Sequence, residues 1–224
     1  MKQLLHGMRR AALPLPLAAL AAPCAAFLLS AAALGGQFSP WALAAVAAAG
    51  TGWNGAAAGL GALLGALAFL DFQPGLRHGA AALLIFCANT AFCTTRLYRR
   101  DWFRPAAAVL ASALVQTAYL WQRGGRQWAL CAAALALLYG CTRLWPQKLG
   151  GPADTGRTGW FLLLLGVCAC LSRLSLYGFT PAMTAAAVLL LALGRAARPA
   201  DLICAGALAG LTLDLCAVDT FYAS

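Results

Sequence analysis

The chain reads FSPWALAAVAAAGTGWNGAAAGLGALLGALAFLDFQPGLR at residues 38–77, and nearly every residue in this stretch is apolar or small. It contains two pairs of glycines spaced four residues apart, Gly55 with Gly59 and Gly61 with Gly65. Residues four apart share one face of a helix, and a face without side chains lets a second backbone approach closely. We therefore expect a membrane-embedded helical hairpin that packs through its glycines.

The solvent decides whether such a glycine-rich helix is stable. In water each internal Gly costs about 1 kcal/mol relative to Ala. In lipid no water is present to bond the backbone, so the helix is enforced and its small face becomes a packing surface. A third pair with the same spacing, Gly206 with Gly210, lies near the C-terminal end of the sequence. These six glycines are the candidates for helix packing and self-association.

The composition of the whole chain is typical of a membrane protein. Hydrophobic residues make up 62% of the 224 residues and charged residues only 10%, whereas a soluble domain carries about 25% charged residues. The sequence has too few polar residues to cover a water-facing globule of this size. It predicts an all-α, polytopic transmembrane bundle in a single domain, with the lipid bilayer as its main partner.

Proline, glycine and charged residues divide the chain into nine apolar segments. Pro40 marks the start of the second helix, because Pro is favoured at the first helical position. That helix is short for a bilayer, which needs about 20 residues. A turn is expected at 35–37, and the polar stretch 146–157 is expected to be a loop between two halves of the bundle. The predicted helices cover about 11–34, 40–52, 55–70, 76–95, 105–121, 127–145, 158–174, 180–193 and 201–218.

The net charge of +10 comes from Lys and Arg placed between the apolar segments. With nine helices and a cytoplasmic N-terminus, 12 of the 16 basic residues fall on the cytoplasmic side, in agreement with the positive-inside rule. If the second and third helices formed one segment, 7 would lie inside and 9 outside. The four outside residues of the nine-helix arrangement are Arg77, Arg123, Arg126 and Arg173. We expect a multi-pass protein of the cell membrane without a nucleic-acid partner, because no basic helix or aromatic-basic surface is present.

Nine membrane passes place the C-terminus on the side opposite to the cytoplasm. The sequence ends soon after the ninth segment, with a short neutral stretch at 221–224. We therefore expect a tenth helix that returns the chain to the cytoplasm, and a longer protein of which these residues are the first part.

Groups for catalysis or metal binding are scarce. All nine Cys lie in or at the ends of apolar segments, none forms a C-x-x-C pair, and the two His are His6 and His78. Free Cys in an apolar helix behaves as a small hydrophobic residue. The acidic residues are six Asp, and the chain contains no phosphate-binding loop and no His-Glu metal motif. We expect no catalytic residue, no metal site and no cofactor within this chain.

Three polar residues in apolar segments are the candidates for an intramembrane polar site. Asn89 and Gln116 would either line a solute path or bond across helices, and the second role is the more common one. Asp214 is a candidate proton or cation site, because an acid inside a membrane is functional by default. The ninth segment ends close to it and Asp219 follows, so an interfacial position is the favoured interpretation.

Two parts of the sequence resemble the N-terminal membrane domain of the stage II sporulation protein E family. The first part comprises FSPWALA at 38–44, GLGALLGA at 59–66 and GLR at 75–77. The second comprises GALAGLTLDLC at 206–216 and FYA at 221–223. The order of hairpins and the basic loops are also similar along the whole chain.

The resemblance implies a function in endospore formation. Members of that family carry about ten membrane helices, then a cytoplasmic central region and a metal-dependent serine/threonine phosphatase domain of the PP2C type. Their membrane part places the phosphatase at the division septum, with cell-division proteins as partners. This chain departs from the pattern because the tenth helix and the phosphatase region are missing. No catalytic residue of the family can therefore be carried over, and Mn or Mg would be needed only by a phosphatase domain that follows.

These features together predict a membrane-anchoring and localising module of a sporulation-associated phosphatase, with no catalysis in this chain itself. The alternative is a small-solute transporter, or the substrate-binding membrane subunit of one. Transporters place broken helices and polar groups near the middle of the membrane. The short second helix and the region around Pro181 are the only such hints in the sequence.

Overall fold

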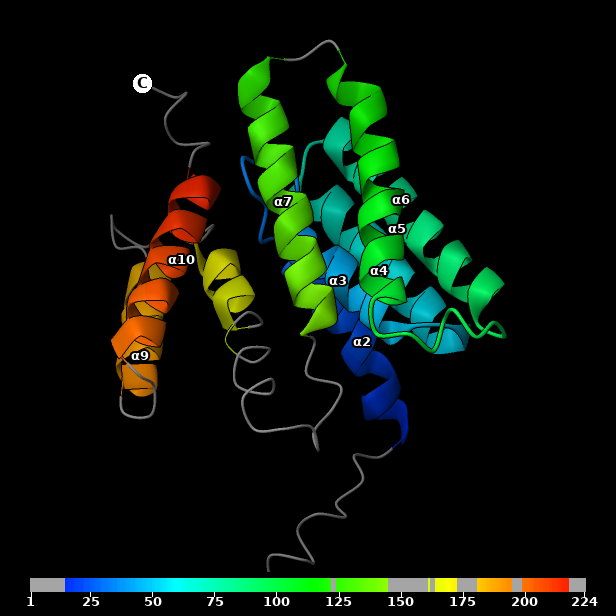
Figure 1. Cartoon of the computed structure of the whole chain (residues 1–224), viewed down its shortest axis with the longest axis horizontal. Coiled ribbons are helices and arrows are strands. Elements are labelled where there is room, and N and C mark those ends of the chain that lie inside the picture. Colours follow the sequence, from blue (N-terminus) through cyan, green and yellow to red (C-terminus); the bar gives the residue numbers. More distant parts are fainter. Residues whose placement is uncertain are drawn as a thin grey trace, which may run out of the picture.

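The computed structural model shows a bundle of helices (Figure 1). The structure describes residues 15–121, 124–144, 161, 164–172, 181–194 and 199–217. Within these ranges the only β-type pairing is an isolated bridge between Leu34 and Phe38. The prediction of an all-α chain is confirmed. The expected loop at 146–157 lies outside the described residues.

The described helices overlap the segments expected from the sequence. A short helical stretch also covers 164–171. α5 begins four residues before the predicted start at 76, because Pro74 is tolerated in the first turn, where its missing N–H has no partner to lose. The named helices are α2 (Leu15–Leu29), α3 (Pro40–Ala49), α4 (Gly52–Phe69), α5 (Phe72–Phe92), α6 (Phe103–Leu120), α7 (Gly125–Arg143), α9 (Pro181–Gly194) and α10 (Pro199–Ala217).

α3 lies at the centre of the bundle. Every residue from Pro40 to Ala48 is buried, and the helix contacts α2, α4, α5, α6 and α7. At a rise of about 1.5 Å per residue its ten residues extend only about 15 Å. This is about half the thickness of a bilayer core, so α3 is an enclosed half-length helix.

The backbone between α2 and α3 is irregular and largely buried. Gly35 and Gly36 adopt φ values of 54° and 67°, a left-handed conformation that favours Gly. They form the turn that was expected at 35–37. The amide of Leu34 donates to the carbonyl of Phe38 at 2.7 Å, and the amide of Gly35 donates to the carbonyl of Leu215 in α10 at 2.9 Å. These bonds satisfy backbone groups that would otherwise be buried without partners.

The turn from α3 to α4 also depends on glycine. Gly50 and Gly52 have φ values of 76° and 72°, where other residues are strained. A Cβ atom on Gly50 would lie 3.2 Å from the hydroxyl oxygen of Tyr98. The α3–α4 turn therefore lies beside the connection between α5 and α6.

α4 packs against α2 through the Gly61–Gly65 pair. A Cβ atom on Gly61 would lie 2.9 Å from Cα of Pro23, and one on Gly65 would lie 2.9 Å from Cα of Phe27. Both distances are shorter than an ordinary carbon contact of about 3.5 Å. The two backbones can therefore approach this closely only because neither glycine has a side chain.

The other candidate glycines differ in their surroundings. Gly55 lies against the backbone of Gly50 and is buried. Gly59, Gly206 and Gly210 have no described atom within 4 Å of the position that a Cβ would occupy. The structure therefore brings Gly55, Gly61 and Gly65 into packing contacts within the chain but not the other three, for which self-association stays a prediction.

The outer surface of the bundle carries large apolar side chains. On α4, Leu60 and Leu64 are 58% and 59% exposed. Of the described helices, α4 alone is long and apolar enough to cross a bilayer, and one third of its apolar window is buried inside the chain. Shorter apolar helical stretches of 10–17 residues run over Leu20–Leu29, Pro40–Ala49, Pro181–Leu191 and Ala205–Cys216.

Candidate functional site

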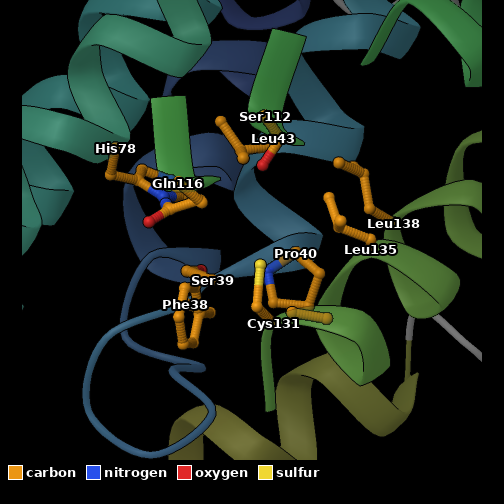
Figure 2. A pocket seen from close by; sticks show the side chains of 11 residues that line it. Phe38, Ser39, Pro40, Leu43, His78, Ser112, Gln116, Cys131, Leu135 and Leu138 are labelled. Atoms are coloured by element: carbon orange, nitrogen blue, oxygen red, sulfur yellow. The ribbon is translucent and has the colours of Figure 1, made fainter. Parts of the chain in front are cut away.

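A small polar cavity lies where α3 begins, between α5, α6 and α7 (Figure 2). About 10 Å³ of it can be occupied by the centre of a water molecule, which is roughly the space that one water needs. The cavity is lined by Phe38, Ser39, Pro40, Leu43, His78, Ser112, Gln116, Cys131, Ala134, Leu135 and Leu138.

His78 is the unusual side chain of this site. It is 0% exposed, and neither Nδ1 nor Nε2 has a hydrogen-bond partner among the described groups. Buried polar atoms in native proteins nearly always have a partner, and leaving one unpaired costs about 1–3 kcal/mol. A fully buried imidazole with two unpaired nitrogens therefore points to a ligand.

Sequence reasoning missed His78, although a signal was present. The buried face of α5 includes His78, Ala82, Ile85 and Asn89, which follow one another at the three- or four-residue spacing of a single helix face. Asn89 was selected from the sequence, and counting back along this face from Asn89 leads to His78.

Gln116 and Ser112 lie one turn apart on the buried face of α6. In Figure 2 the side chains of His78 and Gln116 extend toward each other at one side of the cavity. Nη1 of Arg77 donates to Oε1 of Gln116 at 3.5 Å. The Arg77 guanidinium also lies 3.5 Å from the ring centroid of Tyr119, and such stacking is favourable.

Arg77 is a residue of α5, within the helix predicted at 76–95. It lies in the second turn of α5 and is half-buried, with its charge at the end of the bundle where α5 begins. Its side chain orients Gln116 by occupying the amide oxygen.

The first turn of α3 forms another wall of the cavity. The hydroxyl of Ser39 donates to the carbonyl of Leu29 at 2.8 Å, so it does not cap the helix. Pro40, the next residue, has no N–H to offer. The start of α3 carries the partial positive charge of a helix N-terminus, next to the polar groups of the cavity.

The other two polar candidates lie elsewhere. Nδ2 of Asn89 donates to the carbonyl of Ala47 at 3.5 Å, which joins α5 to the end of α3. Asp214 is exposed on α10. Of the three polar residues selected from the sequence, only Gln116 lines the cavity.

The chemistry available in the cavity is hydrogen bonding. Its lining contains no carboxylate, and the ring nitrogens of His78 bond to neither serine, so no paired nucleophile and base is formed there. Cys131 is the one thiol of the lining. In the ranges that the structure covers, no three His, Cys, Asp or Glu residues are grouped to hold a metal ion.

Comparisons with known proteins identified no similar protein. No family model, no curated protein and no solved structure matches the chain. The functional assignment therefore rests on this chain's own residues and on the sequence resemblance.

Proposed function

We propose that the chain is a multi-pass membrane module that anchors a sporulation-associated serine/threonine phosphatase and places it at the division septum. The module itself carries out no catalysis. Its membrane character rests on one observation above all, which is the distribution of large and small apolar side chains between its surface and its interior.

α4 shows this distribution most clearly. Its buried face consists of Gly and Ala, such as Gly61, Ala62 and Gly65, while Leu60 and Leu64 point outward. In water the reverse is favoured, because burying a Leu side chain contributes about 1.5–3 kcal/mol. In lipid the leucines gain nothing from burial, and small residues let the backbones meet.

The distribution of polar side chains is also the opposite of that in a water-soluble protein. Hydroxyl, amide and imidazole side chains lie in the interior of the bundle, and several of them bond to other helices or to their own backbone, as Thr142 does to the carbonyl of Leu138 at 2.7 Å. This is the expected arrangement when the outside is hydrocarbon. The buried polar residues are Ser30, Ser39, His78, Asn89, Ser112, Gln116, Thr142 and Thr212.

Exposed tryptophans at both ends of the bundle support the same proposal. In Figure 1 the start of α6 and the end of α6 lie at opposite ends. Trp102 precedes α6 and is exposed, and Trp121 follows it and is 85% exposed. Trp53, at the start of α4, is 79% exposed. Such aromatic residues anchor membrane proteins at the two interfaces.

The basic residues indicate which end of the bundle faces the cytoplasm. Arg96, Arg99 and Arg100 are exposed in the connection between α5 and α6. The positive-inside rule then assigns this end to the cytoplasm, together with the N-terminus. Fusing a reporter that is active only in the cytoplasm to each of several loops tests this orientation. Activity after Arg126 instead of at Arg99 would contradict it.

The sporulation role rests on the resemblance of 38–77 and 206–223 to the stage II sporulation protein E membrane domain. The test is a chimera in which this chain replaces the membrane domain of a family member in a spore-forming bacterium. We expect the fluorescently tagged chimera to gather at the asymmetric septum. An even distribution around the cell membrane would remove the localising function and leave only the anchor.

Solute transport is the second candidate, and one observation favours it. The half-length helix α3 starts at a polar cavity lined by His78 and Gln116, and transporters place the ends of broken helices at their binding sites. Uptake of radiolabelled solutes by vesicles containing the protein tests this function. Uptake that is lost in Gln116→Leu would favour transport over anchoring.

A further inference from the structure

The imidazole of His78 lines the cavity at the first turn of α3. The ring is fully buried, with neither nitrogen paired to a described group. A neutral imidazole has one N–H donor and one acceptor nitrogen. Because the two ring nitrogens point in different directions, a ligand in the cavity bonds to one of them, either by donating to the acceptor nitrogen or by accepting from the N–H.

We propose that the cavity is a binding site for a single water molecule, held between His78 of α5 and Gln116 of α6 at the first turn of α3. This inference goes beyond anchoring and does not depend on the sporulation role.

The size and lining of the cavity select this ligand. Its volume of about 10 Å³ for a water centre corresponds to roughly one water molecule. The lining has no acidic side chain to balance a cation. Ser112 and Ser39 supply further hydroxyl groups, and a buried water requires two to four polar partners.

The bound water would connect elements that have few other polar links. Gln116 is already fixed by Arg77, and Ser39 is fixed by the carbonyl of Leu29 at the end of α2. A water between His78 and Gln116 extends this network from α5 and α6 toward the start of α3. The site would therefore hold the half-length helix in place.

The chain allows a direct test, because His6 and His78 are its only histidines. The variant His6→Gln, labelled with ¹⁵N at histidine and placed in lipid bilayers, gives the signal of His78 alone. Solid-state NMR then measures magnetisation transfer from water to the ring. We expect a water-to-ring cross-peak and an acceptor nitrogen shifted in the direction of a hydrogen-bonded imidazole.

Two further substitutions, each made in the His6→Gln background, test the assigned partner. In Gln116→Leu we expect the affinity of the cavity for water to fall about tenfold, which is the factor for the loss of one hydrogen bond, and the transfer from water to the ring to weaken as a result. Asn89→Leu is the matched control, because Asn89 is a buried polar residue of the same helix as His78 but does not line the cavity. It should leave the transfer unchanged.

Three results would overturn the proposal. The first is a His78 ring that shows no transfer from water and the ¹⁵N frequency of a free imidazole, and this result needs no cavity variant to fold. The second is transfer that persists unchanged in Gln116→Leu, because the water would then lie elsewhere. The third is an equal loss in Asn89→Leu, because the effect would not be specific to the cavity.

Discussion

Replacing Gly65 by Ala adds a single methyl group at the closest approach of α2 and α4. The new Cβ would lie 2.9 Å from both Cα of Phe27 and Cβ of Ser30, and it would also meet the carbonyl oxygen of Phe27. The two carbon contacts are about 0.6 Å shorter than the optimal separation of about 3.5 Å. Because backbone atoms of α2 form part of this contact, the strain cannot be relieved by turning a side chain, and the helices must move apart.

The matched control is Gly59→Ala on the same helix, where the added methyl group meets no described atom within 4 Å. Both variants gain the same helix propensity, about 1 kcal/mol, so this contribution cancels when they are compared. Overpacking costs about 1–3 kcal/mol. We therefore expect the free energy of unfolding of Gly65→Ala to lie about 1–3 kcal/mol below that of Gly59→Ala.

Thermal unfolding in detergent micelles, followed with a thiol-reactive fluorescent dye, suits this comparison. Cys131, Cys141 and Cys168 are buried, so they react only as the bundle opens. The midpoint for Gly65→Ala should lie roughly 2–12 °C below that for Gly59→Ala, given about 2–4 °C per kcal/mol for a chain of this size. Equal midpoints, or a lower one for Gly59→Ala, would refute the assignment of the packing face.

Four other substitutions have defined outcomes. Gly59→Leu should leave the midpoint of thermal unfolding unchanged but weaken self-association in crosslinking experiments. Unaltered crosslinking would show that the face of α4 around Gly59 is not the self-association surface. Gly50→Ala places a side chain at φ 76° and should lower the free energy of unfolding by about 1–2 kcal/mol. Ser39→Ala removes the bond to the Leu29 carbonyl and should cost about 0.5–1.5 kcal/mol in the same unfolding assay. Leu64→Arg should raise the apparent free energy of inserting α4 in a translocon assay by about 3 kcal/mol, and normal insertion would contradict a lipid-facing position.

The helices could be predicted from the sequence because the residues that start helices and form turns act locally. Pro40 starts α3 at the predicted residue, and the glycines at 35–36 form the predicted turn. These signals act through backbone conformation, which neighbouring residues largely determine. α5 begins before the predicted start at 76, because Pro and Gly at 74–75 are typical of a turn in a sequence but also fit the first turn of a helix.

The packing faces and the polar cavity could not be predicted in the same way. Gly59 and Gly61 are equally small, and only the position of α2 makes Gly61 a contact residue and leaves Gly59 open. α3 is apolar throughout, so no periodicity marks the side that would face the cavity. The site at His78 forms from four elements that are distant in sequence. The residue pattern of each segment does not show which other segments it packs against.

The bond from the Gly35 amide to the Leu215 carbonyl joins the first connecting loop to the last described helix. The ribosome delivers the N-terminal part first, at about 5–20 residues per second. The turn around Gly35 must therefore wait until Leu215 has been synthesised before this amide finds its partner. The connection that leads from α2 into α3 therefore gains its bond to α10 late during synthesis.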